Sequence, residues 1–266
     1  MRFFIFLFTP LEILPAGLTA MFIQSAKLSR IIHLLKTGKL LYEIKSHLRS
    51  KTGKRADKIL PVIELEELIG DEAEMKLTES DGIDGNVTDE ELRTICRVVG
   101  WFKPETIFEI GTFDGRTTLN MAMNAPPSCR IYTLDLPRSK ISQTRLRIKT
   151  GDLKFINKER SGARFTDTPF EKRITQFYAD SAGFDYSPFY NSIDLIFIDG
   201  SHSYDYVVSD TRNCRKLLRN GKGIIIWHDY GWHEVVKALN EFYRTDPFFA
   251  GMKNIRGTTV AVLIAR

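Results

Sequence analysis

The sequence predicts an α/β fold in which a doubly wound, mostly parallel sheet carries helices on both faces. Short apolar runs alternate along the chain with longer segments whose apolar residues recur at helical spacing, which is typical of such sheets. The run 193–199, IDLIFID, is apolar almost throughout, as a central strand buried on both faces should be. The run 106–110, TIFEI, leads into a glycine turn and then a helix-like segment from Thr117. In this fold class, such a strand–turn–helix unit meets the ligand.

The other elements are expected in chain order. A helix should begin at Thr88, because Thr88 and Glu91 have the spacing of a capping box, and Pro104 should end it. Further strands are expected at 130–135, 173–178, 224–227 and 258–265, and further helices over 117–125, after Ser201 and over 235–243.

A long basic segment separates two of the expected strands. Residues 138–173 contain eleven Lys or Arg and four Asp or Glu, with few apolar residues and no steady period. A loop of this length inside a compact domain is usually functional or mobile. We expect it to act as a lid whose positive charge helps to bind an anionic substrate.

Length and charge divide the chain into three parts. Its 266 residues allow one good core with an appendage, and its net charge is +5. Residues 24–58 carry ten basic and two acidic side chains, a net charge of +8, whereas residues 59–100 carry three and twelve, a net charge of −9. We therefore expect an apolar segment at 1–23, a basic helical extension with an acidic linker at 24–84, and the main domain at 85–266.

The amino-terminal parts leave several alternatives open. Residues 1–23 are apolar but interrupted by two prolines and an acid. They could form a membrane-touching anchor, a packed or disordered tail, or an unused stretch before a start at Met21. Residues 25–49 have the spacing of a basic amphipathic helix, which could lie on a membrane surface, pack on the domain or join two copies in a homodimer. Three widely spaced cysteines favour a reducing, cytoplasmic location.

Acidic residues end the first three expected strands. Glu109, Asp135 and Asp180 fall at or just past the carboxyl ends, which form the ligand crevice of an open parallel sheet. An acid after the second strand is placed to accept hydrogen bonds from a ribose diol, and each buried carboxylate needs a partner. Three acids in register therefore predict a binding site, although any one of them alone could be a helix cap.

A second group of polar residues follows the next two expected strands. Asp199, Ser201 and His202 follow one strand, and His228 and Asp229 follow the other, so all five should face the same crevice. Carboxylates and imidazoles that converge there could bind a hard divalent cation. They could equally act in general base catalysis, because a neutral histidine beside a carboxylate can take a proton from a hydroxyl.

Two motifs resemble a known family. The pattern E-x-G-x-x-x-G at 109–115 resembles the first motif of class I S-adenosylmethionine-dependent methyltransferases. FIDGSHSYDYV at 197–207, followed by IIIWHDYG at 224–231, resembles the small-molecule O-methyltransferase subgroup with an F-I-D-G-x-H-x-Y motif, which is related to catechol O-methyltransferase-like enzymes. The resemblance covers residues 88–266. It implies a Rossmann-like, seven-stranded methyltransferase catalytic domain over 85–266.

The resemblance also implies a cofactor, S-adenosylmethionine, and roles for individual residues. Asp199 and Asp229 stand where relatives have metal ligands, and together with His228 they are the expected site for Mg²⁺ or another divalent metal. His228 and Tyr230 flank Asp229, however, where the catechol-type pattern has Asp-Asn. His202 is the expected general base, with Asp199 and Asp229 as its catalytic neighbours. The expected cofactor-binding residues are Glu109, Gly111, Thr112, Phe113, Asp114, Gly115, Asp135, Asp180, Ser181 and Asp199.

These features predict the methylation of a hydroxyl group on a small metabolite, anionic or sugar-like. The alternative is a non-catalytic protein of the same fold that binds the cofactor. A nucleic-acid substrate is not expected, because residues 199–202 lack the Asn/Asp-Pro-Pro-aromatic turn of base methyltransferases. An NAD-dependent enzyme is not expected either, because Gly111 and Gly115 do not form the G-x-G-x-x-G fingerprint.

Overall fold

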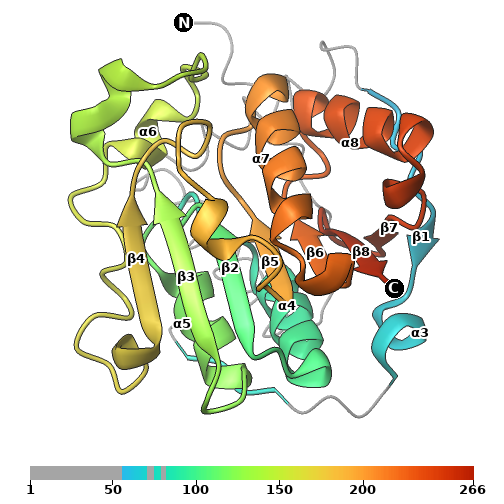
Figure 1. Ribbon diagram of the computed structural model, residues 1–266, viewed down its shortest axis with the longest axis horizontal. Coiled ribbons are helices and arrows are strands. Elements are labelled where there is room, and N and C mark those ends of the chain that lie inside the picture. The colour runs from blue at the N-terminus through green and yellow to red at the C-terminus, as the bar shows by residue number, and fades with distance from the viewer. Residues whose placement is uncertain (1–55, 71–74, 79–81) are drawn as a thin grey trace, which may run out of the picture. The chain divides into compact units, whose positions relative to one another are not determined.

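An eight-stranded sheet forms the centre of the computed structural model, which describes residues 56–70, 75–78 and 82–266 (Figure 1). The strands lie in the order β1-β7-β8-β6-β5-β2-β3-β4. Strand β8 is antiparallel to its neighbours β6 and β7, and the other neighbouring strands are parallel. The bounds are Val62–Ile63 (β1), Thr106–Ile110 (β2), Arg130–Asp135 (β3), Ile174–Tyr178 (β4), Leu195–Ile198 (β5), Gly223–Trp227 (β6), Lys253–Ile255 (β7) and Ala261–Ala265 (β8).

Helices cover both faces of this sheet, which confirms the doubly wound α/β prediction (Figure 1). Helices α4 (Asp89–Phe102) and α5 (Arg116–Asn124) pack against one face, and α7 (Tyr204–Leu217) and α8 (His233–Thr245) against the other. Shorter helices are α3 (Leu65–Ile69), α6 (Leu153–Ile156) and the 3₁₀ turns Arg138–Gln143, Glu171–Arg173, Ser187–Phe189, Arg219–Gly221 and Pro247–Phe249.

Helix α4 begins as the sequence predicts. The Thr88 side chain accepts a hydrogen bond from the backbone N–H of Glu91, and Glu91 Oε2 accepts one from the backbone N–H of Thr88 at 3.0 Å. This reciprocal pair is the capping box, and it satisfies two donors that the first turn would otherwise leave unpaired. The helix ends at Phe102, and the next residue, Lys103, has a left-handed backbone and directly precedes Pro104.

The sheet has one strand more than the seven expected, because part of the predicted linker pairs with it. Strand β1 lies parallel to β7, with Val62 opposite Asn254. Leu60, just before it, is buried in the core with the residues of α7 and α8. Strand β7 offers a free edge on this side, and an extended, apolar segment can pair with such an edge. Residues 62–63, within the segment expected as an acidic linker, therefore belong to the sheet.

The predicted long basic loop folds back over the carboxyl ends of the strands. It contains the 3₁₀ turns Arg138–Gln143 and Glu171–Arg173 and helix α6, and the remainder has no regular structure before β4. The expectations for residues 1–23 and 25–49 lie outside the described residues. No helix among residues 56–70, 75–78 and 82–266 is both long and apolar enough to cross a bilayer.

Candidate functional site

The predicted site residues gather at one edge of the sheet, where its parallel strands end. Glu109 lies in β2, Asp135 ends β3, and Asp180 follows β4. Asp199 directly follows β5, and His228 directly follows β6, which is the neighbour of β5. The residues expected at the strand ends therefore lie along one edge of the sheet.

The turn after β2 requires glycine at two positions, each because of a different neighbour. Gly111 has a φ of +97°, and a Cβ there would lie 2.0 Å from the backbone oxygen of Asp199, so the turn lies directly against the end of β5. Gly115 has a φ of +89° and begins α5, and a Cβ there would lie 2.7 Å from the ring of Phe165. Only a residue without a side chain allows both approaches.

Glu109 is held inside the sheet. Its side chain is fully buried, and Oε2 accepts hydrogen bonds from the hydroxyls of Thr118 and Thr133, both at 2.5 Å. The other carboxyl oxygen, Oε1, has no hydrogen-bond partner among the described residues. Burial, together with the charges of Asp199 and Asp135, raises the pKa of Glu109 to about 8 despite these hydrogen bonds. Glu109 is therefore largely protonated at neutral pH.

Other residues of the turn are engaged within the protein. Asp114 Oδ1 accepts hydrogen bonds from Asn86 Nδ2 at 2.8 Å and from the backbone N–H of Arg116 at 3.0 Å. Its Oδ2 accepts one from Arg164 Nε at 2.7 Å. Asp114 therefore fixes the start of α5 and ties it to the basic segment. Thr112 likewise shares a 2.6 Å hydrogen bond between hydroxyls with Thr133, beneath the turn.

Asp135 is covered by the basic segment. Lys158 Nζ lies 2.6 Å from its Oδ2, and the Ser161 hydroxyl donates a hydrogen bond to the same oxygen. The Phe113 backbone also donates to this carboxylate. Burial raises the pKa of Asp135, and the charge of Lys158 opposes the increase. The acid expected to bind a ribose diol is thus held by side chains from residues 136–172.

Asp180 is held by three hydrogen bonds. Its Oδ2 accepts from the backbone N–H of Arg145 at 2.7 Å, and its Oδ1 accepts from the Tyr206 hydroxyl at 2.8 Å and from the backbone N–H of Ala182 at 3.2 Å. Its neighbour Ser181 donates to Asp210, a fully buried carboxyl whose pKa burial raises to about 7. Asp210 was not predicted as a site residue, because an acid in a helix interior carries no local signal of burial.

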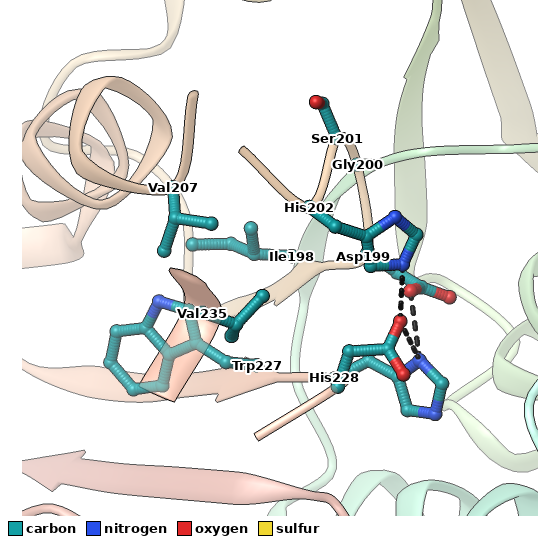
Figure 2. Close-up of a pocket in the computed structure, with 10 residues that line it drawn as sticks. Ile198, Asp199, Gly200, Ser201, His202, Val207, Trp227, His228 and Val235 are labelled. Carbon is teal, nitrogen blue, oxygen red and sulfur yellow. Dashed lines mark hydrogen bonds and ion pairs between the residues drawn. The ribbon is translucent and has the colours of Figure 1, made fainter. Parts of the chain in front are cut away.

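His202 lies between two carboxylates. Its Nε2 is 2.5 Å from Asp229 Oδ2, and its Nδ1 is 2.7 Å from Asp152 Oδ1. Burial lowers the pKa of His202, but the hydrogen bonds and charges of the two carboxylates outweigh burial and raise the pKa to about 10. Figure 2 shows His202 and His228 converging on the same carboxylate, beside a cavity of about 20 Å³, which is room for about one water molecule.

His228 also contacts several carboxylates. Its Nδ1 lies 2.9 Å from Asp199 Oδ1 and 3.3 Å from Asp229 Oδ2, and its Nε2 lies 3.1 Å from Glu91 Oε2. Burial lowers the pKa of His228, but these acids raise it well above the ordinary value. Ligand atoms of Asp199, His228 and Asp229 all lie within 4.8 Å of one another, so the predicted metal set comes together in space.

Two of these partners were not predicted as site residues. Asp152 lies in the aperiodic basic segment, 50 positions before His202, and Glu91 was recognised only as a capping residue. An aromatic neighbour was also missed. The Trp232 ring lies 4.9 Å from the His202 ring, and 43% of this tryptophan is exposed.

Comparison with known proteins agrees with this fold. Residues 108–230 match the family model described as a methyltransferase domain. No curated protein sequence matches the chain. Among solved structures, the chain is similar to the S-adenosylhomocysteine-bound methyltransferase PaMTH1 of Podospora anserina. The TM-score is 0.51 and the identity 16%, over 69% of this chain and 81% of that chain.

Another similar structure is the O-methyltransferase TomG of Streptomyces achromogenes, with a TM-score of 0.48 and 15% identity, over 84% of this chain and 96% of that chain. Likenesses at these identities concern the fold. The family match spans the glycine turn, the basic segment and both histidines of the site. The chain therefore contains a region, residues 108–230, that matches a methyltransferase domain, in a fold shared with methyltransferases of known structure.

Proposed function

We propose that the chain transfers a methyl group from S-adenosylmethionine to a hydroxyl group of a small metabolite, anionic or sugar-like, and that His202 removes the hydroxyl proton. The observation that carries this proposal is the position of His202. It lies at the carboxyl edge of the sheet, bonded to Asp229 at 2.5 Å, and Asp199 before it contacts the glycine turn after β2. Methyl transfer needs little beyond an oriented acceptor and a base for its proton.

The chemistry of the crevice fits the proposed cofactor. The charges of Asp135 and Asp199 contribute to the raised pKa of Glu109, so a positively charged ligand beside these acids would favour the ionised form of Glu109. Oε1 of Glu109 is a buried polar atom without a hydrogen-bond partner among the described residues. Asp135 offers two carboxylate oxygens for a ribose diol once Lys158 and Ser161 withdraw. When bound, the cofactor supplies an electrophilic methyl group on its sulfonium.

A divalent cation also fits the site. Asp199, His228 and Asp229 present two carboxylates and an imidazole nitrogen within 4.8 Å of one another, a donor set that Mg²⁺ or a transition metal can use. A cation there would orient the acceptor hydroxyl and make it more acidic. It would also draw Asp229 away from His202.

The surroundings of His202 support a ring-shaped acceptor. Trp232 exposes an aromatic face beside the imidazole, and such a face can stack on an aromatic ring or on the apolar face of a sugar. Lys149 of the basic segment pairs with Glu234 at 2.8 Å, at the start of the helix that follows Trp232. A lysine of the basic segment therefore lies near the start of α8, where it could contact an anionic acceptor.

Calorimetric titration of S-adenosylmethionine into the protein, with and without Mg²⁺, tests the proposal. Micromolar binding is expected for the unmodified chain and for Asp185→Asn, an exposed control. Asp135→Asn should weaken it at least tenfold through the ribose contact. Release of S-adenosylhomocysteine is then measured with catechol, 3,4-dihydroxybenzoate and glucose 6-phosphate as acceptors. Absence of cofactor binding in every condition would refute the proposal.

A further inference from the structure

Helix α7 carries two buried polar side chains that contact the loop after β4. Tyr206 and Asp210 are four positions apart, so they lie on the same face of the helix, and only 3% and 1% of their surfaces are exposed. We propose that this pair, the α7 clamp, positions Asp180 and Ser181 so that the loop binds the adenine base of S-adenosylmethionine. The inference rests on the proposed function, and the clamp acts through the loop rather than by touching the cofactor.

Tyr206 holds the first of the two loop residues. Its hydroxyl donates a hydrogen bond to Asp180 Oδ1 at 2.8 Å. The same oxygen accepts from the backbone N–H of Ala182 at 3.2 Å, and the Asp180 carbonyl accepts from the backbone N–H of Gly183 at 2.9 Å. The loop therefore turns around the Asp180 side chain, and the phenol fixes that side chain from outside the loop.

Asp210 holds the second loop residue. The Ser181 hydroxyl donates a hydrogen bond to its carboxyl group. Oδ1 of Asp210 has no hydrogen-bond partner among the described residues, so Oδ2 is the oxygen that receives this bond. A Cβ added to Gly200 would lie 3.4 Å from the same Oδ2. Asp210 therefore joins the loop after β4 to the turn after β5, deep inside the protein.

The order of the strands indicates which part of the cofactor reaches this loop. Strand β3 lies between β2 and β4, and Asp135 at the end of β3 is the acid expected to bind the ribose. A cofactor that extends from the glycine turn after β2 past Asp135 would place its base beside Asp180, because the ends of the parallel strands form one edge.

Asp180 still has room for a ligand. Among the described residues, its Oδ2 accepts one hydrogen bond, from the backbone N–H of Arg145 at 2.7 Å. A carboxylate oxygen has two lone pairs, so Oδ2 can also accept from the 6-amino group of adenine. Hypoxanthine has a carbonyl oxygen in place of that amino group and would repel the carboxylate. A site that is built to accept from an amino group rejects such an analogue strongly, provided that the acceptor is held in place.

Three variants test the clamp. Tyr206→Phe removes only the hydroxyl that donates to Asp180. Asp210→Ala removes the acceptor of the Ser181 hydroxyl, whereas Asp210→Asn keeps an amide oxygen that can accept the same hydrogen bond. Asp205→Asn is the matched control, because Asp205 is an exposed acid on the same helix.

The readout is calorimetric titration of the full chain with S-adenosylhomocysteine and with S-inosylhomocysteine, which differ only in the base. The unmodified chain, Asp205→Asn and Asp210→Asn should bind the adenosyl ligand at least about tenfold more tightly than the inosyl ligand. Tyr206→Phe and Asp210→Ala should reduce this ratio about three- to tenfold, because only the adenosyl ligand loses a well-placed acceptor.

Enzyme kinetics give a second readout that a merely structural role would not produce. With any acceptor from the panel above that turns over, Tyr206→Phe should raise the KM for S-adenosylmethionine and leave kcat unchanged. The reason is that the base lies at the opposite end of the cofactor from the methyl group, so its contacts are the same before and during the transfer.

Equal Kd values for the two ligands in the unmodified chain would overturn the proposal, and this comparison decides the point even if Asp210→Ala does not fold. The full ratio in Tyr206→Phe, or in a folded Asp210→Ala, would overturn it as well. Failure of the unmodified chain to bind S-adenosylhomocysteine is a different result, because it would refute the proposed function itself.

Discussion

Glu91 Oε2 lies 3.1 Å from His228 Nε2, although 137 positions separate the two residues. The same carboxylate oxygen accepts from Thr88 in the capping box of α4, and Oε1 accepts from the Thr259 backbone at 2.8 Å. Burial raises the pKa of Glu91, but the hydrogen bond and charge of His228 outweigh it and hold the pKa well below the ordinary value. The buried carboxylate of Glu91 therefore both caps α4 and contacts a histidine of the site.

Glu91→Gln should consequently lower the stability of the fold. Loss of a buried, charge-assisted hydrogen bond costs about 1.5–3 kcal/mol, and the neutral amide also leaves His228 with one acid fewer. Urea unfolding should show a lower midpoint than for Glu90→Gln, an exposed neighbour in the same turn. Equal midpoints for the two variants would show that the contact between Glu91 and His228 contributes nothing.

Gly111→Ala should prevent correct folding of the turn after β2. A Cβ would lie 2.0 Å from the Asp199 backbone oxygen, and backbone cannot yield as a flexible side chain can. Gly257→Ala is the control, because Gly257 has a similar positive φ of +78° but no atom within 4 Å of an added Cβ. The control should lose only about 1–2 kcal/mol, the cost of the left-handed backbone alone. Thermal melts compare the two, and similar losses would contradict the close approach.

The stability of Glu109→Gln, relative to that of the unmodified chain, should increase as the pH rises. The pKa of Glu109 is raised to about 8 by burial, whereas that of an unfolded glutamate is near 4.3. The folded state therefore binds the proton more tightly, so this group's contribution is fully present below about pH 4.3 and is lost as the pH rises toward 8. Glutamine keeps a neutral side chain at every pH. Its melting temperature relative to the unmodified chain should therefore be higher at pH 8 than at pH 5, and a constant difference would contradict a raised pKa.

Lys158→Ala should tighten binding of S-adenosylmethionine. Lys158 occupies Asp135 at 2.6 Å, so a ligand that uses this carboxylate must first displace the ammonium group. Without this partly buried ion pair, the free energy of cofactor binding should become more favourable by at most about 1.4 kcal/mol. This corresponds to a Kd up to about tenfold lower. Lys172→Ala, an exposed lysine of the same segment, should leave the Kd unchanged. Weaker binding by Lys158→Ala would mean that Lys158 contacts the cofactor itself.

Much of the fold and part of the site could be predicted from local patterns. The apolar run at 195–198 forms the central strand β5, and Thr88 and Glu91 form the predicted capping box. Acids and histidines that follow parallel strands reached one edge of the sheet, because strand direction alone places their carboxyl ends together. Strand β1 was missed, because two extended residues after a proline carry too little pattern to be told from a linker.

The sequence by itself determined the α/β alternation and which residues stand at the carboxyl edge, since both follow from the spacing of apolar residues and the burial it requires. Only the tertiary structure decided which carboxylate meets which imidazole. Asp152 reaches His202 because an aperiodic segment folds back over the strand ends, and Glu91 reaches His228 because α4 packs beside β6 and β8. Such contacts depend on long-range packing, and no repeating pattern along the chain records them.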